Sequence, residues 1–153
     1  MHGTRFGWAA LGAAALACGR PGAGAPAPLA GGPEAARAAV VALLAHGAAA
    51  WTHGDLDAFV SDYAAGATFV TPARLLHGRD EIRAHYAPRF APGAPRDSLW
   101  FRDLEVDVLA PDALNAIAWY VLQRGDSVVA RGPTSLVMRF AAGRWSIVHD
   151  HSS

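Results

Sequence analysis

Two histidines stand two positions apart near the end of the chain, at His149 and His151. Alternate residues of a strand share a face, so both imidazoles should face the same way as Ile147, with Asp150 on the opposite face. Imidazole exchanges protons near neutral pH, which makes His149 a candidate general acid or base and His151 a candidate ligand contact at a pocket mouth. The simpler alternative is that both are polar residues at the end of a sheet or at a dimer contact, and for His151 this alternative is preferred.

A strand that carries a His-x-His pair can also present two nitrogens to one zinc ion. A third ligand would have to come from His77 or His85, and nothing in the sequence brings either of them beside the pair. His46 and His53 are interpreted as helix-surface residues. We therefore expect no metal site.

Two tyrosines are further candidates for acid–base chemistry, because a buried hydroxyl must find a hydrogen-bond partner. We assign Tyr63 and Tyr86 to this role beside His149. Most aromatic side chains fill the core, but some should border a ligand. The aromatic residues expected to contact an apolar ligand are Trp51, Phe69, Phe90 and Trp100. Trp119 and Tyr120 are neighbours in a predicted strand, so only one of them can point inward.

Three charged residues have two interpretations each. Asp57 and Asp62 flank a short predicted helix, and one of them could turn inward as a carboxylate base, although exposure to solvent is the simpler expectation. Arg139 is either a counter-charge for an acidic ligand in a pocket or a rim residue on the outer face of a sheet. The residue pattern alone does not choose between these alternatives.

The composition excludes several classes of function. The 153 residues suffice for one domain with a well-buried core. The 13 basic residues are all arginine and balance 13 acidic residues, so the chain has no excess positive charge with which to bind nucleic acid. The sequence contains no Gly-rich phosphate loop and no nucleotide-binding fingerprint, and we expect no cofactor.

The first 18 residues have the features of a secretory signal peptide, with a basic start and an apolar run, too short to span a bilayer, that ends at the only cysteine, Cys18. Residues 15–18 (ALAC) are similar to a bacterial lipobox, so Cys18 is the expected lipidation site; the alternative is a plain signal peptide with an incidental cysteine. Residues 19–33 contain nine Gly or Pro and are predicted to be a flexible tether. These features predict a secreted domain, residues 34–153, held in the bacterial cell envelope by a lipid anchor.

Helical spacing dominates the first half of the predicted domain. Apolar residues recur at three- and four-residue steps over residues 34–51, which predicts an amphipathic helix that stops at Gly54. Asp55 can cap a second short helix, in which the same spacing extends to Tyr63. Residues 79–90 should form a third helix, with two acidic residues in its first turn.

The remaining segments have the alternation and the turns of β-strands. Gly132-Pro133 should mark a bulge in one of them, because proline cannot donate to the hydrogen-bond ladder. The predicted strands are residues 67–71, 75–77, 104–108, 114–124, 127–140 and 145–151. Three helices packed on a long antiparallel meander make an α+β fold, and a curved sheet with helices on one face encloses a conical cavity.

Several segments together resemble the nuclear transport factor 2-like superfamily, closest to its SnoaL-like and ketosteroid-isomerase-like branches, which include many uncharacterised bacterial proteins. The segments are residues 51–57 (WTHGDLD) with Tyr63, 67–72 (ATFVTP), 77–82 (HGRDEI) and 143–149 (GRWSIVH), and the similarity spans residues 36–152 or so. The resemblance implies a cone-shaped fold, with three N-terminal helices on a curved antiparallel sheet and an apolar pocket. It does not imply one activity, because the superfamily includes isomerases, cyclases, dehydratases, hydrolases and binding domains.

The ketosteroid isomerase branch uses an aspartate base at the end of the first strand, and Thr71 stands at that position in this chain. Gly47 stands where that branch has an oxyanion-binding tyrosine. A threonine hydroxyl cannot abstract a proton near neutral pH, so the resemblance does not carry an isomerase mechanism to this chain.

The resemblance also implies a homodimer that pairs through the open face of the sheet. Ile117, Trp119 and Val121 alternate along one predicted strand and would give this face an apolar surface. A mature domain that sediments as a monomer at micromolar concentration would contradict this expectation.

Two classes of function remain. The first is a non-catalytic, envelope-attached domain that binds an apolar small molecule. This class is favoured because the sequence lacks the isomerase base and shows no recognisable nucleophile with its own base. The second is a cofactor-independent acid–base enzyme of the isomerase, cyclase or dehydratase type, acting on a small cyclic or polyketide-like substrate through His149 with Tyr63 or Tyr86. An enclosed pocket with convergent polar groups would favour the enzyme.

Overall fold

The computed structural model describes residues 32–153. The predicted signal peptide, Cys18 and nearly all of the predicted tether lie outside the described residues. The first helix begins at Gly32, so residues 32 and 33 belong to this helix and not to the predicted tether.

Three helices lie close to their predicted positions: α1 (Gly32–His53), α2 (Leu56–Ser61) and α3 (Gly78–Phe90). The corner between α1 and α2 depends on Gly54, whose φ of 76° suits glycine, and on Asp55, which caps α2 by accepting a hydrogen bond from the Ala58 N–H at 2.9 Å. The prediction that this helix extends to Tyr63 is wrong. Tyr63 opens the first strand instead, and the Arg79 guanidinium donates to its carbonyl.

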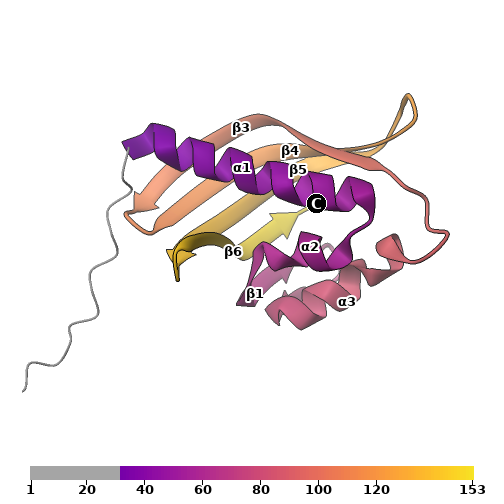
Figure 1. Cartoon of the computed structure of the whole chain (residues 1–153), viewed down its shortest axis with the longest axis horizontal. Helices are drawn as coiled ribbons and strands as arrows, with labels where there is room; N and C mark the ends of the chain where they lie inside the picture. Colours follow the sequence, from indigo (N-terminus) through magenta and orange to yellow (C-terminus); the bar gives the residue numbers. More distant parts are fainter. Residues whose placement is uncertain (1–31) are drawn as a thin grey trace, which may run out of the picture.

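Six strands form one sheet in the order β2-β1-β6-β5-β4-β3 (Figure 1). Every neighbouring pair is antiparallel except β1 and β6, which run parallel, so the expectation of a fully antiparallel sheet is wrong at this pair. A parallel pair needs a long crossover, and the chain between β1 and β6 provides it. The strands are β1 (Tyr63–Val70), β2 (Leu75–His77), β3 (Ser98–Ala110), β4 (Ala113–Arg124), β5 (Ser127–Ala141) and β6 (Arg144–Ser152).

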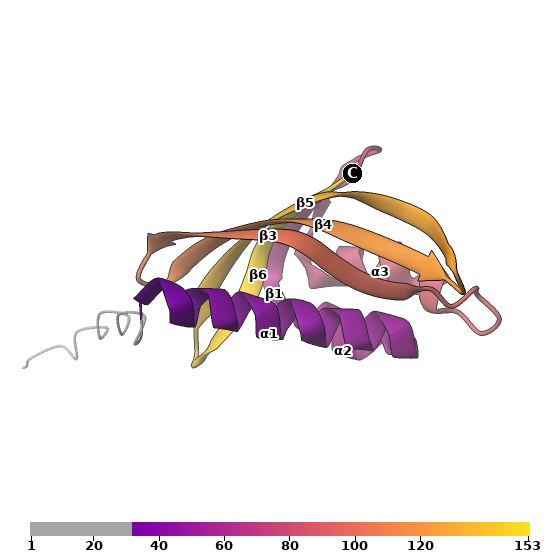
Figure 2. The ribbon, with the colours of Figure 1, turned by 90° about the horizontal axis from the view of Figure 1, so that it is seen from above.

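The three helices cover one face of the curved sheet, and no described helix covers the other face (Figure 2). The longest helix, α1, lies beside β3, where the Arg37 guanidinium donates to the Leu104 carbonyl at 3.0 Å. By length and composition α1 could also cross a membrane, but it is a core helix of this domain. It buries Ala36, Val40, Leu43, Leu44 and Ala50.

Strand β5 contains one extra residue, but not where the sequence predicts it. Val129 lies between two residues of β5 that pair with consecutive residues of β4, whereas the pairing around Gly132 and Pro133 is regular. The prediction of a bulge at Gly132-Pro133 is therefore wrong. The Pro133 carbonyl accepts a hydrogen bond from the Ser153 N–H, so the backbone of Pro133 faces the end of β6 and not β4. The missing N–H of this proline therefore removes no hydrogen bond between β5 and β4.

Strand β6 also contains an extra residue, Val148, because Ile147 and His149 pair with consecutive residues of β5. A bulge of this kind reverses the face to which all later side chains of the strand point. Asp150 and Ser152 therefore face the helices together with Ile147.

Candidate functional site

A cavity of about 410 Å³ lies between the helices and the inner face of the sheet. This volume is in the range of small-molecule sites in proteins. Most of the wall is apolar and comes from all three helices and five strands. Its large apolar residues are Leu43, Leu44, Trp51, Phe59, Phe69, Leu99, Phe101, Leu122, Leu136 and Ile147.

An aromatic cluster forms one wall of the cavity, with Phe59 of α2 at its centre. The Phe59 ring centroid lies 5.4 Å from Trp51 and 5.0 Å from Tyr86, both in edge-on geometry. Phe69 stacks on Tyr86 at 5.6 Å, with ring planes 8° apart. The predicted ligand-binding residues Trp51 and Phe69 do line the cavity, whereas Phe90 packs against Trp51 at 5.3 Å and is not part of the lining.

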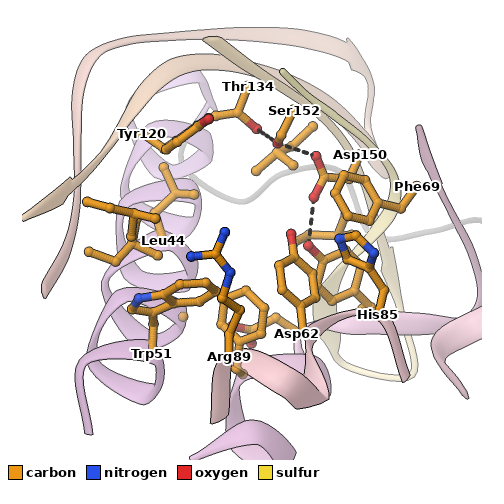
Figure 3. A pocket seen from close by; sticks show the side chains of 18 of the residues that line it. Leu44, Trp51, Asp62, Phe69, His85, Arg89, Tyr120, Thr134, Asp150 and Ser152 are labelled. Atoms are coloured by element: carbon orange, nitrogen blue, oxygen red, sulfur yellow. Dashed lines mark hydrogen bonds between the residues drawn. The ribbon is translucent and has the colours of Figure 1, made fainter. Parts of the chain in front are cut away.

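Asp150 is a buried acid in the cavity wall, only 3% exposed. Its two carboxylate oxygens accept hydrogen bonds from the Tyr63 hydroxyl at 2.6 Å and the Ser152 hydroxyl at 2.7 Å (Figure 3). The Ser152 hydroxyl is in turn 2.9 Å from the Thr134 hydroxyl. Burial raises the pKa of Asp150, and the hydrogen bonds from Tyr63 and Ser152 oppose the rise. The carboxyl group therefore takes up a proton more readily than an exposed aspartate does.

Tyr63 and Tyr86, the two predicted acid–base tyrosines, both line the cavity. Burial raises the pKa of each phenol, and the negative charge of Asp150 raises both further. Each hydroxyl therefore stays protonated and can donate a hydrogen bond. Their chemical role remains a prediction.

The predicted placement of His149 and His151 in the cavity is wrong. The bulge at Val148 turns both imidazoles to the outer face of the sheet, where His149 Nδ1 lies 2.7 Å from Thr68 Oγ1 and His151 is exposed. Asp150, which the regular alternation places outside, takes the inward position instead. The acid–base group that β6 brings to the cavity is thus a carboxyl group and not an imidazole.

A second carboxylate, that of Asp62, borders the cavity at the end of α2. It is 15% exposed, and His46 Nδ1 on α1 lies 2.9 Å from its nearer oxygen. Burial raises the pKa of Asp62, while His46 and Arg144 oppose the rise. The simple expectation of solvent exposure is wrong for Asp62, whereas Asp57, 78% exposed and paired with Arg83, is at the surface.

Two basic side chains of α3, His85 and Arg89, stand at the opening of the cavity. Both are exposed, and the Arg89 guanidinium points toward the interior space (Figure 3). Partial burial, together with the charges of Arg74 and Arg89, lowers the pKa of His85. The positive charge at this opening therefore comes from arginine, beside an imidazole that favours its neutral form.

Trp100, predicted to contact the ligand, lies away from the cavity, and so does Arg139, for which a pocket position was one of two alternatives. Trp100 is 42% exposed on the outer face, because its two neighbours on β3 are the residues that point inward. Arg139 is exposed and pairs with Asp112 at 3.1 Å, which agrees with the rim alternative and not with a counter-charge in the pocket. Of the adjacent pair on β4, Tyr120 faces the cavity and Trp119 faces outward.

The two positions compared with ketosteroid isomerase, Thr71 and Gly47, both border the cavity. The Thr71 hydroxyl donates to the Arg74 carbonyl at 2.8 Å and accepts from the Arg74 N–H at 3.0 Å, so it is engaged in a turn. Gly47 adjoins the Asp62 carboxylate. The place of the isomerase base is therefore occupied by a structural hydroxyl.

Within residues 32–153, no three His, Cys, Asp or Glu side chains gather where they could hold a metal ion. His85 lies on the cavity side of the sheet, opposite the face that carries His149. It cannot serve as the third ligand considered for the His-x-His pair.

Sequence reasoning missed five polar contributors to the cavity: Asp150, Ser152, Ser153, Thr134 and Arg89. Thr134 and Ser152 are small hydroxyl residues of a kind found throughout strands, so nothing marks them in the sequence. A weak signal existed for Asp150, because two adjacent apolar residues, Ile147 and Val148, break the strict alternation just before it.

A family model for a SnoaL-like domain matches residues 40–153 of this chain. No curated protein matches the sequence significantly. Among solved structures, an NTF2-like protein of unknown function from Shewanella oneidensis MR-1 is 27% identical, with a TM-score of 0.69 over 76% of this chain and 98% of that chain.

Two further structures share the fold at lower sequence identity. An NTF2-like protein of unknown function from Pseudomonas putida KT2440 is 20% identical, with a TM-score of 0.68 over 78% of this chain and 87% of that chain. A protein from Catenulispora acidiphila, solved in complex with S-DNPA, is 20% identical, with a TM-score of 0.66 over 78% of this chain and 94% of that chain. The α+β NTF2-like fold is thus established, and it does not by itself specify an activity.

Proposed function

The chain belongs to the SnoaL-like domain family, and from this premise we propose that its cavity binds a small, largely apolar molecule that carries a polar group. The observation that carries the proposal is an apolar cavity of about 410 Å³ with the hydrogen-bonded pair Asp150 and Tyr63 in its wall. Apolar walls supply the binding free energy, and a few placed polar groups fix the orientation of a ligand. A carbonyl or hydroxyl group on the ligand suits the phenol and carboxyl groups of this wall.

A fluorescence titration with anilinonaphthalene sulfonate, an environment-sensitive aromatic dye, tests this proposal. The wild-type domain is expected to bind one dye molecule saturably. Ala130→Phe places a ring into the cavity that Ala130 lines, and should weaken binding at least about tenfold, a loss of about 1.4 kcal/mol. Val129→Phe is the matched control, because Val129 is 44% exposed and lies outside the cavity lining. Equal binding by all three proteins would show that the dye does not occupy the cavity.

A second candidate, a cofactor-independent acid–base enzyme, is favoured by one specific observation. Burial raises the pKa of Asp150 while Tyr63 stays protonated beside it, and a carboxyl group tuned in this way can exchange a proton with a bound molecule. The substrate class is a small cyclic or polyketide-like molecule. Turnover of a cyclic ketone that disappears in Asp150→Asn, while dye binding persists, would support this function; unchanged turnover would reject the role of Asp150.

We also propose that the open face of the sheet pairs with a second copy of the chain. Trp100, Ile117 and Trp119 are each about 40% exposed on this face. Val121, predicted to add to the same surface, is buried and contributes little. Exposed aromatic and branched side chains that lie together on an uncovered face are typical of a protein–protein contact.

The charge-introducing variant Trp119→Arg is expected to convert this dimer to a monomer, because it places an unpaired charge in an apolar contact. Sedimentation equilibrium should show a dimer for the wild type at micromolar concentration and a dissociation constant raised at least about tenfold for the variant. Val41→Arg, on the exposed side of α1, is the control and should leave the dimer intact. A monomeric wild type would contradict the proposal.

The predicted signal and Cys18 would hold this pocket at the cell envelope. In that case the ligand is a molecule that reaches the envelope and not one confined to the cytoplasm. Fractionation of cells that express the full chain tests the location, with Cys18→Ser expected to release the domain from the membrane fraction. A wild-type chain that stays in the cytoplasmic fraction would exclude this location.

A further inference from the structure

Arg89 brings a positive charge to the opening of the cavity. It stands in the last turn of α3, and its guanidinium points toward the interior space (Figure 3). Of the described residues that line the cavity, it is the one with a permanent positive charge. An arginine at the end of a helix interacts favourably with the helix dipole, but this side chain turns into the pocket, where it can contact a bound molecule.

The guanidinium of Arg89 has no acidic partner in the described part of the chain. The ion pairs found within residues 32–153 use other basic side chains. The two acids of the cavity wall are engaged elsewhere, because His46 lies 2.9 Å from Asp62 and two hydroxyls donate to the oxygens of Asp150. The positive charge of Arg89 is therefore available to an acidic group on a ligand.

The charge of Arg89 acts on two side chains of the cavity wall. Burial raises the pKa of the Tyr86 phenol, and Arg89 is among the groups that oppose this rise. Partial burial lowers the pKa of His85, and the charges of Arg74 and Arg89 lower it further. The opening thus has a positive electrostatic field, which disfavours a protonated imidazole and stabilises an anion.

His85 stands one helical turn before Arg89 and can add a second hydrogen bond. Residues four apart on a helix share a face, and both of these line the cavity. The imidazole of His85 packs edge-on against Phe69 and Tyr86, with ring centroids 5.5 Å and 5.0 Å away. In its neutral form the ring keeps one N–H donor. A guanidinium and an imidazole N–H on one helix face suit the two oxygens of a carboxylate.

The interior of the cavity favours the opposite end of such a molecule. The rings of Trp51, Phe59 and Phe69 give it an apolar, aromatic wall. Asp62 and Asp150 line the same interior and, when ionised, repel a negative charge brought next to them. A flat apolar body is therefore stabilised inside the cavity, and an anionic group is stabilised at its opening.

We propose that the ligand of this cavity is a small aromatic or alicyclic carboxylic acid, bound with its apolar body against the aromatic cluster and its carboxylate on Arg89 and His85. The inference rests on the proposed function, because it names the class of molecule that the cavity binds. Arg89 and His85 then fix which end of the ligand faces the opening. A neutral analogue of the same shape lacks the charge-assisted hydrogen bonds to the guanidinium and binds more weakly.

Isothermal titration calorimetry with two matched compounds tests this proposal. Naphthalene-2-carboxylate and naphthalene-2-carboxamide have nearly the same shape and differ in charge. At neutral pH the wild-type protein is expected to bind the carboxylate at least about tenfold more tightly than the amide, as a charge-assisted hydrogen bond allows. Arg89→Met retains a long apolar side chain without the charge. It should weaken binding of the carboxylate to the level of the amide and leave binding of the amide unchanged.

Two further variants and one further compound make the test specific. Arg83→Met removes an arginine of the same helix that lies outside the cavity lining and pairs with Asp57, so it should keep the full preference for the carboxylate. Arg89→Lys retains the charge without the planar fork and should keep a smaller preference. An equal loss in Arg83→Met and Arg89→Met would show a general effect of charge and overturn the role of Arg89. Tighter binding of 2-naphthyl phosphate than of the carboxylate would overturn the carboxylic acid as the ligand class.

Comparison with the dye titration separates the possible failures. If the dye, the carboxylate and the amide all fail to bind, the proposed function fails and this inference fails with it. If the dye binds in the cavity but the wild type does not prefer the carboxylate to the amide, the ligand class is wrong while the binding function stands. A preference for the carboxylate that survives in Arg89→Met would overturn the role of Arg89.

Discussion

Replacement of Phe59 by alanine is expected to lower the free energy of unfolding by about 3–5 kcal/mol, the usual cost of removing a core phenylalanine. Phe59 is 9% exposed, and its ring lies within 6.3 Å of four aromatic rings, those of Trp51, Tyr63, Tyr86 and Phe90. Its removal opens a hole between α1, α2 and α3, next to a cavity that already exists. Thermal unfolding should show a melting temperature lower by more than about 10 °C.

Two control variants make the result for Phe59 interpretable. Phe59→Leu keeps most of the buried volume and should cost less than about 1.5 kcal/mol. Val128→Ala, at a residue that is 54% exposed, should stay within about 0.5 kcal/mol of the wild type. A loss below about 1 kcal/mol for Phe59→Ala would show that the neighbouring rings collapse into the space, and that the cluster does not support the cavity wall.

Asp150→Ala is the second change with a large expected effect, a loss of about 2–4 kcal/mol. It removes the acceptor of the Tyr63 and Ser152 hydroxyls, and a buried polar group left without a partner costs about 1–3 kcal/mol. Asp150→Asn is the matched control, because its amide oxygen can still accept one of these bonds, and it should lose clearly less. Urea denaturation at constant pH measures both changes. Equal losses for the two variants would mean that packing, and not hydrogen bonding, dominates at this site.

The pH dependence of stability tests the raised pKa of Asp150. Because burial raises the folded-state pKa above the ordinary value, folding favours the neutral carboxyl group. This contribution is fully present below the ordinary pKa of aspartate and is lost as pH rises through the raised pKa. Asp150→Asn has no such titration, so its stability should fall less than that of the wild type between acidic and neutral pH. Asp62, whose pKa is also raised, accounts for a decline that remains. An identical decline in both proteins would contradict the shift at Asp150.

The helices could be predicted because their signals are local. Apolar spacing identifies α1 and α3, and the Asp55 cap marks the start of α2. The end of α2 was missed because Tyr63 continues the helical spacing, whereas its actual place depends on distant contacts. These are the Arg79 guanidinium on its carbonyl and Asp150 on its hydroxyl.

The polar side of the cavity could not be predicted with the same success, because it depends on the register between strands. On β4, alternation shows that only one of Trp119 and Tyr120 can face inward, and on β6 it gives the correct face for Ile147. Beyond this point the prediction fails, since pairing with β5 decides where the extra residue of β6 lies. A bulge is a property of two strands, and the pattern of one strand does not determine it.

Contacts between distant helical positions were also invisible in the sequence. His46 and Asp62 are 16 residues apart, and they meet because the corner at Gly54 folds α2 back beside α1. Each looked like an ordinary surface residue by itself. Burial by the cavity wall, which no local pattern shows, is what raises the pKa of Asp62.

The bulge in β6 also bears on how this pocket can change during evolution. The bulge accommodates Val148 while Ile147 and His149 pair with consecutive residues of β5, so deletion of Val148 would leave these pairs as a regular strand. Asp150 would keep its inward position, and the imidazoles of His149 and His151 would stay on the outer face. A shift of the strand that brought Val148 into regular pairing would instead turn every later residue over and bring both imidazoles inward. The reactive group that this strand presents to the pocket thus depends on how the strand pairs, and it can change without any substitution in the lining.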